Sequence, residues 1–271
     1  MNSSTKLPTL FIPHGGGPCF FMDVPPPLPR GLWDSMANYL RGIAASLPQR
    51  PTAVLIVSGH WETEVATVNA APEHSLYYDY YGFPDHTYRL PYPAKGSPGL
   101  AARIRTLLTD AGIASAEDTG RGLDHGVFVP LMLVYPQADI PLVQLSLRHD
   151  MDAAAHLNIG RALQPLRDEG VLIVGSGMSY HNLRKLMSGQ GDRESSVFDT
   201  WLTEAVTDPD PSGRSASLSA WRAAPFATDC HPVAEHLLPL HVAVGAAGND
   251  IGRRVFSDRL MGKAISAYQF G

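Results

Sequence analysis

The sequence predicts a single α/β domain spanning residues 1–271, with a central, mostly parallel or mixed sheet flanked by helices. Continuous β-branched runs, typical of strands buried on both faces, occur at residues 53–57 (AVLIV) and 171–174 (VLIV). Segments with the apolar period of helices alternate with these runs, as in folds built around parallel strands. Neither an internal repeat nor a convincing linker divides the 271 residues, so we expect one domain.

The N-terminal part begins with an apolar run at residues 9–13, which predicts a strand that ends at a histidine. Residues 24–30 (VPPPLPR) predict an extended surface segment, because prolines cannot continue a helix or a central strand. A helix is expected at 32–47 and a strand at 53–57. Residues 77–98 are rich in Tyr, Pro and Gly and predict a long, ordered but irregular excursion.

The C-terminal part continues the alternation of helices and strands. A surface loop is expected where Pro, Ser, Asp and Gly concentrate, at residues 208–219, and Pro232 suits the first turn of a final helix. The remaining expected elements are helices at 98–112, 128–135, 151–169 and 232–244 and a strand at 141–147, besides the strand at 171–174.

Composition excludes several classes of function. Lys and Arg number 21 against 26 Asp and Glu, a net charge of −5 without a basic block, so nucleic acid and membrane surfaces are poor partners. No apolar run approaches the ~20 residues of a membrane span, and the N-terminus has no leader pattern, so we expect a cytoplasmic protein. Two cysteines, Cys19 and Cys230, exclude a disulfide framework and a zinc site of several thiolates. A homodimer is one option for the oligomeric state, which the sequence leaves open.

Histidine is the unusual residue, with eleven copies. His14, His60 and His181 each follow a buried-type strand, at the end where open α/β sheets place their ligand sites. His236 lies in the first turns of the expected C-terminal helix, and His125 follows Asp124 in a glycine-containing loop. Any one of them alone is more simply a hydrogen-bonded core residue, but three at equivalent strand ends favour a shared site. The other six carry no functional prediction: His74, His86, His149, His156, His231 and His241.

Imidazoles brought together from separate strands are typical of a site for a borderline divalent metal. A serine hydrolase is the rival interpretation, because the sequence HGGG after His14 also occurs in the oxyanion loops of some esterases. The nearest nucleophile elbow, residues 177–181 around Ser179, has His181 where the tight turn requires a small residue. The metal site is therefore the stronger prediction.

The chain resembles the class III extradiol ring-cleavage dioxygenases, the superfamily of protocatechuate 4,5-dioxygenase, and most of all its single-chain DOPA 4,5-dioxygenase-like branch. Each matching segment is a weak signal alone, but together they run from end to end of the chain. They are LPTLFIPHGGGP, VLIVSGHWET, FPDHTYRLPYPAKGSP, LDHGVFVPL, DIPLVQLSL, VLIVGSGMSYHNLR and EHLLPLHVAVGAAG.

This resemblance implies that His14, His60 and His236 bind the metal. It implies an acid/base role for His181, which also approaches the ion in zinc-loaded forms, and contact of His125 with substrate or oxygen. The first loop departs from the family pattern by reading HGGGP. The protocatechuate enzymes have a carboxylate as third ligand, at a position that aligns here with His236, next to Glu235. Adjacent helical residues diverge by ~100°, so only one of the two can point at the metal, and we choose His236.

The implied reaction is cleavage of a catechol ring by O₂ beside its two hydroxyls, giving a semialdehyde. Fe(II) is the metal the family implies, and Zn(II) also suits three histidines. Two alternatives stay open: a zinc-dependent hydrolase using the same three histidines, and a non-catalytic binding protein on this fold.

Three further features of the sequence concern the surroundings of the site. Asp124 is a candidate to orient His125. The aromatic stretch 77–92 and Trp61 are either a pocket wall or loop packing, and Arg184 is more simply a surface residue than a partner for a substrate carboxylate.

Overall fold

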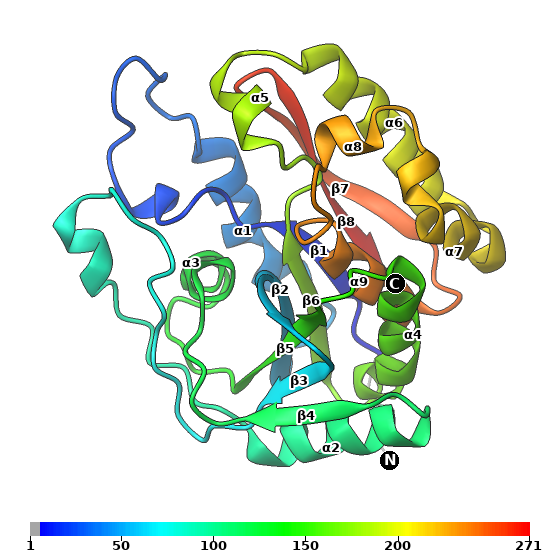
Figure 1. The fold of residues 1–271 in the computed structure, drawn as a ribbon. Helices are drawn as coiled ribbons and strands as arrows, with labels where there is room; N and C mark the ends of the chain where they lie inside the picture. The colour runs from blue at the N-terminus through cyan, green and yellow to red at the C-terminus, as the bar shows by residue number, and fades with distance from the viewer. Residues whose placement is uncertain (1–5) are drawn as a thin grey trace.

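The protein is a single α/β domain around one mixed sheet, as the sequence predicts. The computed structural model describes residues 6–271, in which eight strands follow the order β4-β3-β5-β2-β6-β1-β8-β7 (Figure 1). The four central strands β5, β2, β6 and β1 are parallel, whereas β3 runs antiparallel to β5 and β8 runs antiparallel to β1 and β7. Their bounds are β1 Thr9–Pro13, β2 Ala53–Thr63, β3 Ala66–Asn69, β4 Ser115–Asp118, β5 Leu142–Arg148, β6 Val171–Gly177, β7 Gly252–Leu260 and β8 Lys263–Phe270.

Helices cover both faces of this sheet. On one face α1 packs against α3, and on the other α9 lies on β6 and β1 with α4 beside it (Figure 1). The α-helices are α1 Asp34–Ser46, α2 Pro98–Asp110, α3 His125–Val134, α4 Ala153–Leu163, α5 Leu183–Met187, α6 Asp192–Thr207, α7 Pro211–Ser219, α8 Ala227–Cys230 and α9 Leu238–Ala247. Short 3₁₀ turns occupy Cys19–Phe21, Asp85–Arg89, Gln164–Arg167 and Trp221–Ala223. Within residues 6–271, none of the helices combines the length and the apolar character needed to cross a bilayer.

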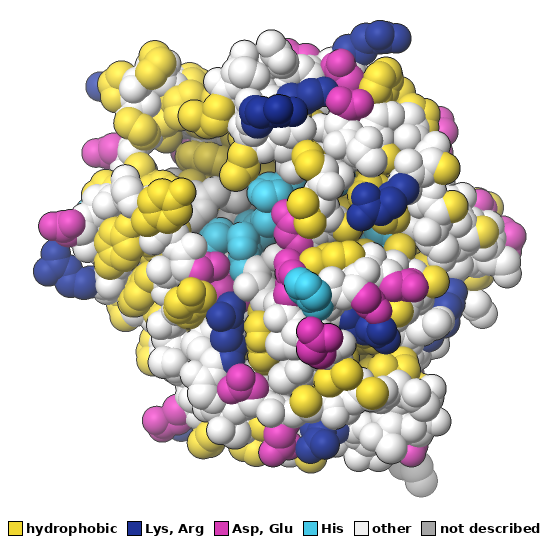
Figure 2. Space-filling view, in the orientation of Figure 1, with side chains coloured by type: hydrophobic (Ala, Val, Ile, Leu, Met, Phe, Trp, Pro, Cys, Tyr) yellow, Lys and Arg dark blue, Asp and Glu magenta, His cyan; other side chains and the backbone are white. Residues whose placement is uncertain are grey.

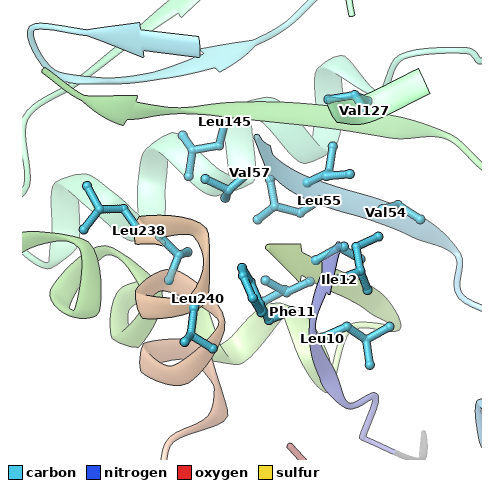
Figure 3. Packing of buried hydrophobic residues seen from close by; sticks show 14 of the residues in the cluster. Leu10, Phe11, Ile12, Val54, Leu55, Val57, Val127, Leu145, Leu238 and Leu240 are labelled. Atoms are coloured by element: carbon cyan, nitrogen blue, oxygen red, sulfur yellow. The ribbon is translucent and has the colours of Figure 1, made fainter. Parts of the chain in front are cut away.

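The main core lies between the central strands and α9. Phe11 of β1, Leu55 of β2 and Leu240 of α9 are fully buried and face the same apolar layer (Figure 3). Burial on both faces explains why the central strands read as continuous apolar runs, since helices exclude water from either side. The core therefore fixes the four parallel strands whose carboxyl ends lie at one edge of the sheet.

Helices α4 and α9 approach each other unusually closely. A Cβ atom added to Gly160 of α4 would lie 2.2 Å from the carbonyl oxygen of Val242, and one added to Gly245 of α9 would lie 2.1 Å from that of Leu157. Neither site has room for a methyl group, so the two backbones meet directly. This contact fixes α4 against α9, which itself packs on β6 and β1.

The expected elements are largely present, and the structure differs from the expectation in four places. The loop expected at 208–219 contains α7, because Asp210 caps its N-terminus by accepting from the amides of Ser212 and Gly213 and Pro211 occupies the first turn. The helix expected at 151–169 gives way to a 3₁₀ turn at Gln164–Arg167, beside Pro165. The sequence predictions do not include β3, β4, β7, β8 or helix α6; of these, β4 and β7 are the two edge strands of the sheet, and the buried face of α6 repeats at helical spacing through Phe198, Leu202 and Val206.

The helix expected from residue 232 begins only at Leu238. Pro239 has no N–H and is accommodated in the first turn of α9, whereas a helix starting at Pro232 would place it in an interior turn. Residues 232–237 instead form a series of turns.

We expect Gly160→Ala to lower the free energy of unfolding by about 1–3 kcal/mol, because the added methyl group clashes with the backbone of α9. Gly42→Ala is the matched control, since a Cβ there meets nothing within 4 Å and α1 is a regular helix. That control should gain roughly 0.5–1 kcal/mol from its lower backbone entropy. Urea unfolding of both variants measures the difference, and equal effects would contradict the close packing of α4 and α9.

Candidate metal centre and active site

Five histidines that are far apart in the sequence meet at the carboxyl edge of the central strands. They are His14, His60, His125, His181 and His236, and Figure 2 shows histidine side chains on the floor of a hollow in this face. His14, His125 and His236 are buried, while His60 and His181 keep about a fifth of their side-chain surface exposed. The five residues that the sequence analysis selected therefore form one cluster.

The central strands position the first histidines, with one correction to the predicted geometry. His14 directly follows β1, and its backbone N–H continues the ladder by donating to the carbonyl of Gly177 (3.2 Å). His60 does not lie past the end of its strand, because β2 continues to Thr63 after an irregularity between Val57 and Glu62. This break in register re-aims the strand locally, as bulges do.

The turns before α9 supply His236, which therefore does not lie on a helix as predicted. They rest directly on strand backbones: a Cβ added to Gly177 would lie 2.1 Å from the carbonyl oxygen of His236, and one added to Gly59 would lie 2.9 Å from that of Glu235. The amide of Met178 donates to the carbonyl of His236 (3.0 Å). Gly59 within β2 and Gly177 at the end of β6 thus let His236 reach the histidines of the neighbouring strands.

Three of the imidazoles are close enough to hold one ion. The Nε2 atoms of His14 and His60 are 3.2 Å apart, and one ring nitrogen from each of His14, His60 and His236 lies within 4.8 Å of the others. Since metal–imidazole bonds are about 2.0–2.1 Å long, one ion can bind two nitrogens at the shorter separation. His181 stacks on His236 with ring centroids 3.3 Å apart.

Hydrogen bonds fix which nitrogen of each imidazole is free. The Ser176 hydroxyl donates to the carbonyl of Gly126, so its oxygen accepts from Nδ1 of His14 (3.1 Å). One oxygen of Glu235 accepts from Nδ1 of both His236 and His181, each at 3.0 Å. With Nδ1 protonated, Nε2 of these rings carries the lone pair, which is how second-shell acceptors orient metal ligands.

His125 is oriented by Asp79 and not by Asp124 as predicted. Asp79 Oδ1 accepts from both the backbone amide (2.9 Å) and Nδ1 (2.8 Å) of His125, and Oδ2 lies 3.7 Å from Nδ1 of His60. Asp124 is fully buried and accepts from the Ser58 hydroxyl and the Gln144 amide, at the N-terminus of α3. No sequence pattern distinguishes Asp79, an acidic residue within the Tyr-rich irregular stretch.

Burial keeps His14, His60 and His236 uncharged. It lowers the pKa of His14 and of His236 well below the ordinary value, and neighbouring imidazoles lower both further. Burial also lowers the pKa of His60 to about 3, together with repulsion from His125 and despite attraction by Asp79. Neutral imidazole is the form that binds metal, so all three lone pairs are available at neutral pH.

Two carboxylates beside the cluster, those of Asp79 and Glu235, keep their charge. Burial raises the pKa of Asp79 and of Glu235, but hydrogen bonds from His125 and from His181, respectively, outweigh this effect, and the net pKa of each is lowered. Burial raises the pKa of Asp124. The second oxygen of Glu235 is buried and unpartnered within residues 6–271, which indicates further capacity to accept a proton or a ligand.

The donor set therefore fits a borderline divalent ion such as Fe(II) or Zn(II). Three nitrogen donors would leave other coordination positions free, and the anionic side chains of Asp79 and Glu235 would balance part of the charge of a bound ion. The serine hydrolase does not fit, because Ser179 is buried and its hydroxyl oxygen accepts from the backbone amide of Ser266 (2.8 Å).

A cavity of about 460 Å³ opens beside the five histidines, a size usual for small-molecule sites. Of the predicted aromatic wall only Phe83 lines it. Trp61 instead is buried, with the guanidinium of Arg121 5.8 Å from its ring centroid, and Arg184 is exposed outside the cavity. Tyr78 and Tyr80 pack mainly against Phe128 and their own loop, although the Tyr80 ring also borders that of His125.

The six remaining histidines lie outside this cluster. Five of them bond to backbone carbonyls and His149 lies at the surface beside Glu62; the five are His74, His86, His156, His231 and His241.

Fold and site together define an α/β protein with a histidine centre of the metal-binding kind beside a small-molecule cavity. Residues 8–271 match the family described as the catalytic LigB subunit of aromatic ring-opening dioxygenase. The chain belongs to this family, which confirms the predicted superfamily.

Similar proteins cover most of the chain. Dioxygenase tasH of Hapsidospora irregularis is 38% identical over 99% of this chain and 88% of its own length. Proteins named 4,5-DOPA dioxygenase extradiol are 44% identical in Beta vulgaris (74% of this chain, 75% of the relative) and 36% identical in Escherichia coli K12 (90% and 86%). A crystal structure of an uncharacterized protein from Escherichia coli K12 superimposes with a TM-score of 0.77 at 33% identity, covering 98% of this chain and all of that one. These relatives support an oxygenase reaction and the DOPA dioxygenase-like branch.

We expect Ser176→Ala to weaken the binding of a divalent metal by about 10- to 100-fold, because Nδ1 of His14 loses the acceptor that fixes its tautomer. Ser179→Ala is the matched control, a buried serine on the same segment whose hydroxyl bonds to Ser266 and not to a histidine. Competition with a chromogenic chelator measures both affinities. Equal losses in the two variants would show that the effect is a general loss of packing.

Proposed function

We propose that the protein is a non-haem, metal-dependent extradiol dioxygenase that opens a catechol-type ring with O₂. The observation that carries the proposal is the convergence of neutral His14, His60 and His236 beside a cavity that two further imidazoles border. Three ligands on one side of an ion leave space for the two oxygens of a catechol and for O₂.

His14, His60 and His236 are the proposed ligands, and Fe(II) is the proposed metal. When bound, the ion would hold catechol and O₂ together and pass electron density between them. Zn(II) would fit the same nitrogens without supporting this redox chemistry. Glu235 is proposed to act on His236 through the hydrogen bond to its Nδ1 and not as the third ligand.

His181 is the proposed acid/base group. Its Nδ1 donates to Glu235, so Nε2 is the atom that takes a proton from a catechol hydroxyl. The negative charge of Glu235 stabilises the imidazolium that results, and the proton is later returned from the same atom. The stacking of His181 on His236 keeps this base beside the ligand set.

His125 is proposed to hydrogen-bond substrate or oxygen through Nε2. Asp79 holds its Nδ1 proton and its backbone amide, so the ring has little freedom to rotate. Its centroid is 4.0 Å from that of His60, and His125 therefore lies at the edge of the proposed ligand set.

In the proposed reaction both atoms of O₂ enter the product. The carbon–carbon bond beside the hydroxyl pair breaks, one oxygen atom completes an aldehyde and the other completes a carboxyl group. The catechol supplies the electrons that reduce O₂, so no further reductant is needed.

We expect anaerobic loading with Fe(II), followed by O₂ and a panel of catechols, to give equimolar O₂ uptake and a coloured semialdehyde. Oxygen electrode traces and absorbance spectra record the two quantities together. Zinc-loaded protein is the control and should consume no O₂. Absence of O₂ uptake with every catechol, with zinc-dependent hydrolysis of esters or amides, would refute a dioxygenase and favour a hydrolase.

We expect His236→Ala to abolish stoichiometric metal binding and His181→Ala to keep most of the metal while losing turnover. Glu235→Gln should lower metal affinity only about tenfold, because the amide oxygen of Gln can still accept a hydrogen bond from Nδ1 of one of the two histidines. His149→Ala, a surface histidine, is the control for the substitution itself. Metal analysis after dialysis decides the assignment: loss of metal from Glu235→Gln but not from His236→Ala would reverse it.

A further inference from the structure

The cavity beside the histidines extends well beyond the space that a catechol ring needs. Its outer wall comes from three segments that carry none of the proposed ligands: the loop at residues 22–33, helix α5 and the turn between β7 and β8. Each segment contributes apolar side chains to the lining, for example Leu28, Leu186 and Met261, respectively. The wall is therefore continuous with the histidines but chemically different from them.

Apart from the histidines, the lining holds no ionisable group except the Cys19 thiol and the Tyr180 phenol, since no Lys, Arg, Asp or Glu of residues 6–271 contributes to it. The side chain of Asn182 already makes two hydrogen bonds within the protein: its amide group donates to the carbonyl of Asp229, and its oxygen accepts from the backbone amide of Lys185. The ammonium of Lys185 pairs with the carboxylate of Asp229. Burial raises the pKa of Cys19 to about 12 and also raises that of Tyr180, so both are uncharged.

A shallower hollow on the other side of the imidazoles also lacks a cation. Glu62 and Glu235 line it with Val233, and no Lys or Arg among the described residues does so. An amino-acid substrate such as DOPA carries a carboxylate, and neither hollow offers that group an Arg or Lys partner. Burying an unpaired carboxylate in an apolar wall is costly.

We propose that this enzyme takes neutral catechols with a bulky apolar substituent, which occupies the cavity between the loop at residues 22–33, α5 and the β7–β8 turn. The proposal rests on the proposed ring-opening function and assigns the substrate class of the same site. It separates this chain from relatives named for DOPA, whose substrate is zwitterionic. Exposed Leu183 and Met187 at the mouth extend the apolar surface to solvent.

The expected selectivity follows from the hydrophobic effect. Each methylene of the substituent that the wall buries is worth about 0.8 kcal/mol, or roughly a fourfold gain in kcat/KM. A series from catechol through 4-methyl- and 4-butyl- to 4-hexylcatechol should therefore climb steeply until the cavity is full. L-DOPA, of similar length but charged, should fall below 4-butylcatechol by at least tenfold.

The first experiment measures kcat/KM for this series and for 3-(3,4-dihydroxyphenyl)propionate with the Fe(II) enzyme and with two variants. Leu28→Arg places a cation in the partly exposed wall and should raise the ratio of the carboxylate substrate to 4-butylcatechol by about tenfold or more. Ile251→Arg adds the same charge at an exposed site outside the cavity and should leave the ratio unchanged. A preference of the unmodified enzyme for L-DOPA, or an equal ratio change in both variants, would overturn the proposal.

A second experiment measures the cavity without turnover. Metal-free protein is titrated calorimetrically with 4-butylphenol and 4-hexylphenol, which cannot chelate through two oxygens, and with L-tyrosine. We expect the alkylphenols to bind with a negative heat-capacity change and tyrosine to bind at least tenfold more weakly. Leu28→Arg should weaken only the alkylphenols.

The two experiments separate the proposals. Alkylphenol binding without O₂ uptake on any catechol would refute ring opening and keep the apolar cavity. Ring opening that favours charged catechols, with no alkylphenol binding, would refute the apolar substrate and keep the dioxygenase.

Discussion

The histidine centre depends on one close approach of backbone to backbone. The segment leading into α9 lies so near the central strands that Gly175 and Gly177 of β6 have no room for a side chain, with virtual Cβ atoms 2.2 Å and 2.1 Å from the carbonyls of Pro239 and His236. Any larger residue at either position would lift this segment from the sheet. His236 would then move away from the histidines next to β1 and in β2, so the absence of a Cβ atom at these two positions is needed for the cluster to form.

The same centre is shaped by groups that accept hydrogen bonds from the imidazoles. Ser176 accepts from Nδ1–H of His14, Asp79 from that of His125, and Glu235 from those of both His181 and His236. Together these hydrogen bonds leave the Nε2 lone pairs free, in a site so buried that His14 and His236 are uncharged. Uncharged nitrogen atoms whose lone pairs face one another are stable together when a cation lies between them. These electrostatics suit a metal centre, as expected for a member of a family of ring-opening dioxygenases.

The sequence predicts the parts of this structure that local patterns determine. Apolar runs located β1, β2, β5 and β6, and three of the five clustered histidines were found because they follow such runs. Patterns failed where tertiary contacts decide the conformation. Pro232 is typical of a helix start, but Pro239 sets the beginning of α9. Neither β7 nor β8 has a strand-like alternation of buried and exposed residues, because β7 is largely exposed and β8 is buried along most of its length. Asp79 and His125 form a hydrogen bond although 46 residues separate them, and no local pattern signals such a contact. The prediction that the adjacent residue Asp124 orients His125 is therefore wrong.

The wall of the cavity and the histidine centre are built from separate parts of the chain. Substitutions at positions such as Leu28 or Met261 touch no histidine acceptor, and distant sites usually contribute independently to the free energy. Such a division allows substrate preference to diverge during evolution while the chemistry stays fixed. A protein with this fold can therefore change the wall of its cavity without changing the histidine centre, and membership of the family does not by itself specify the molecule that the cavity accepts.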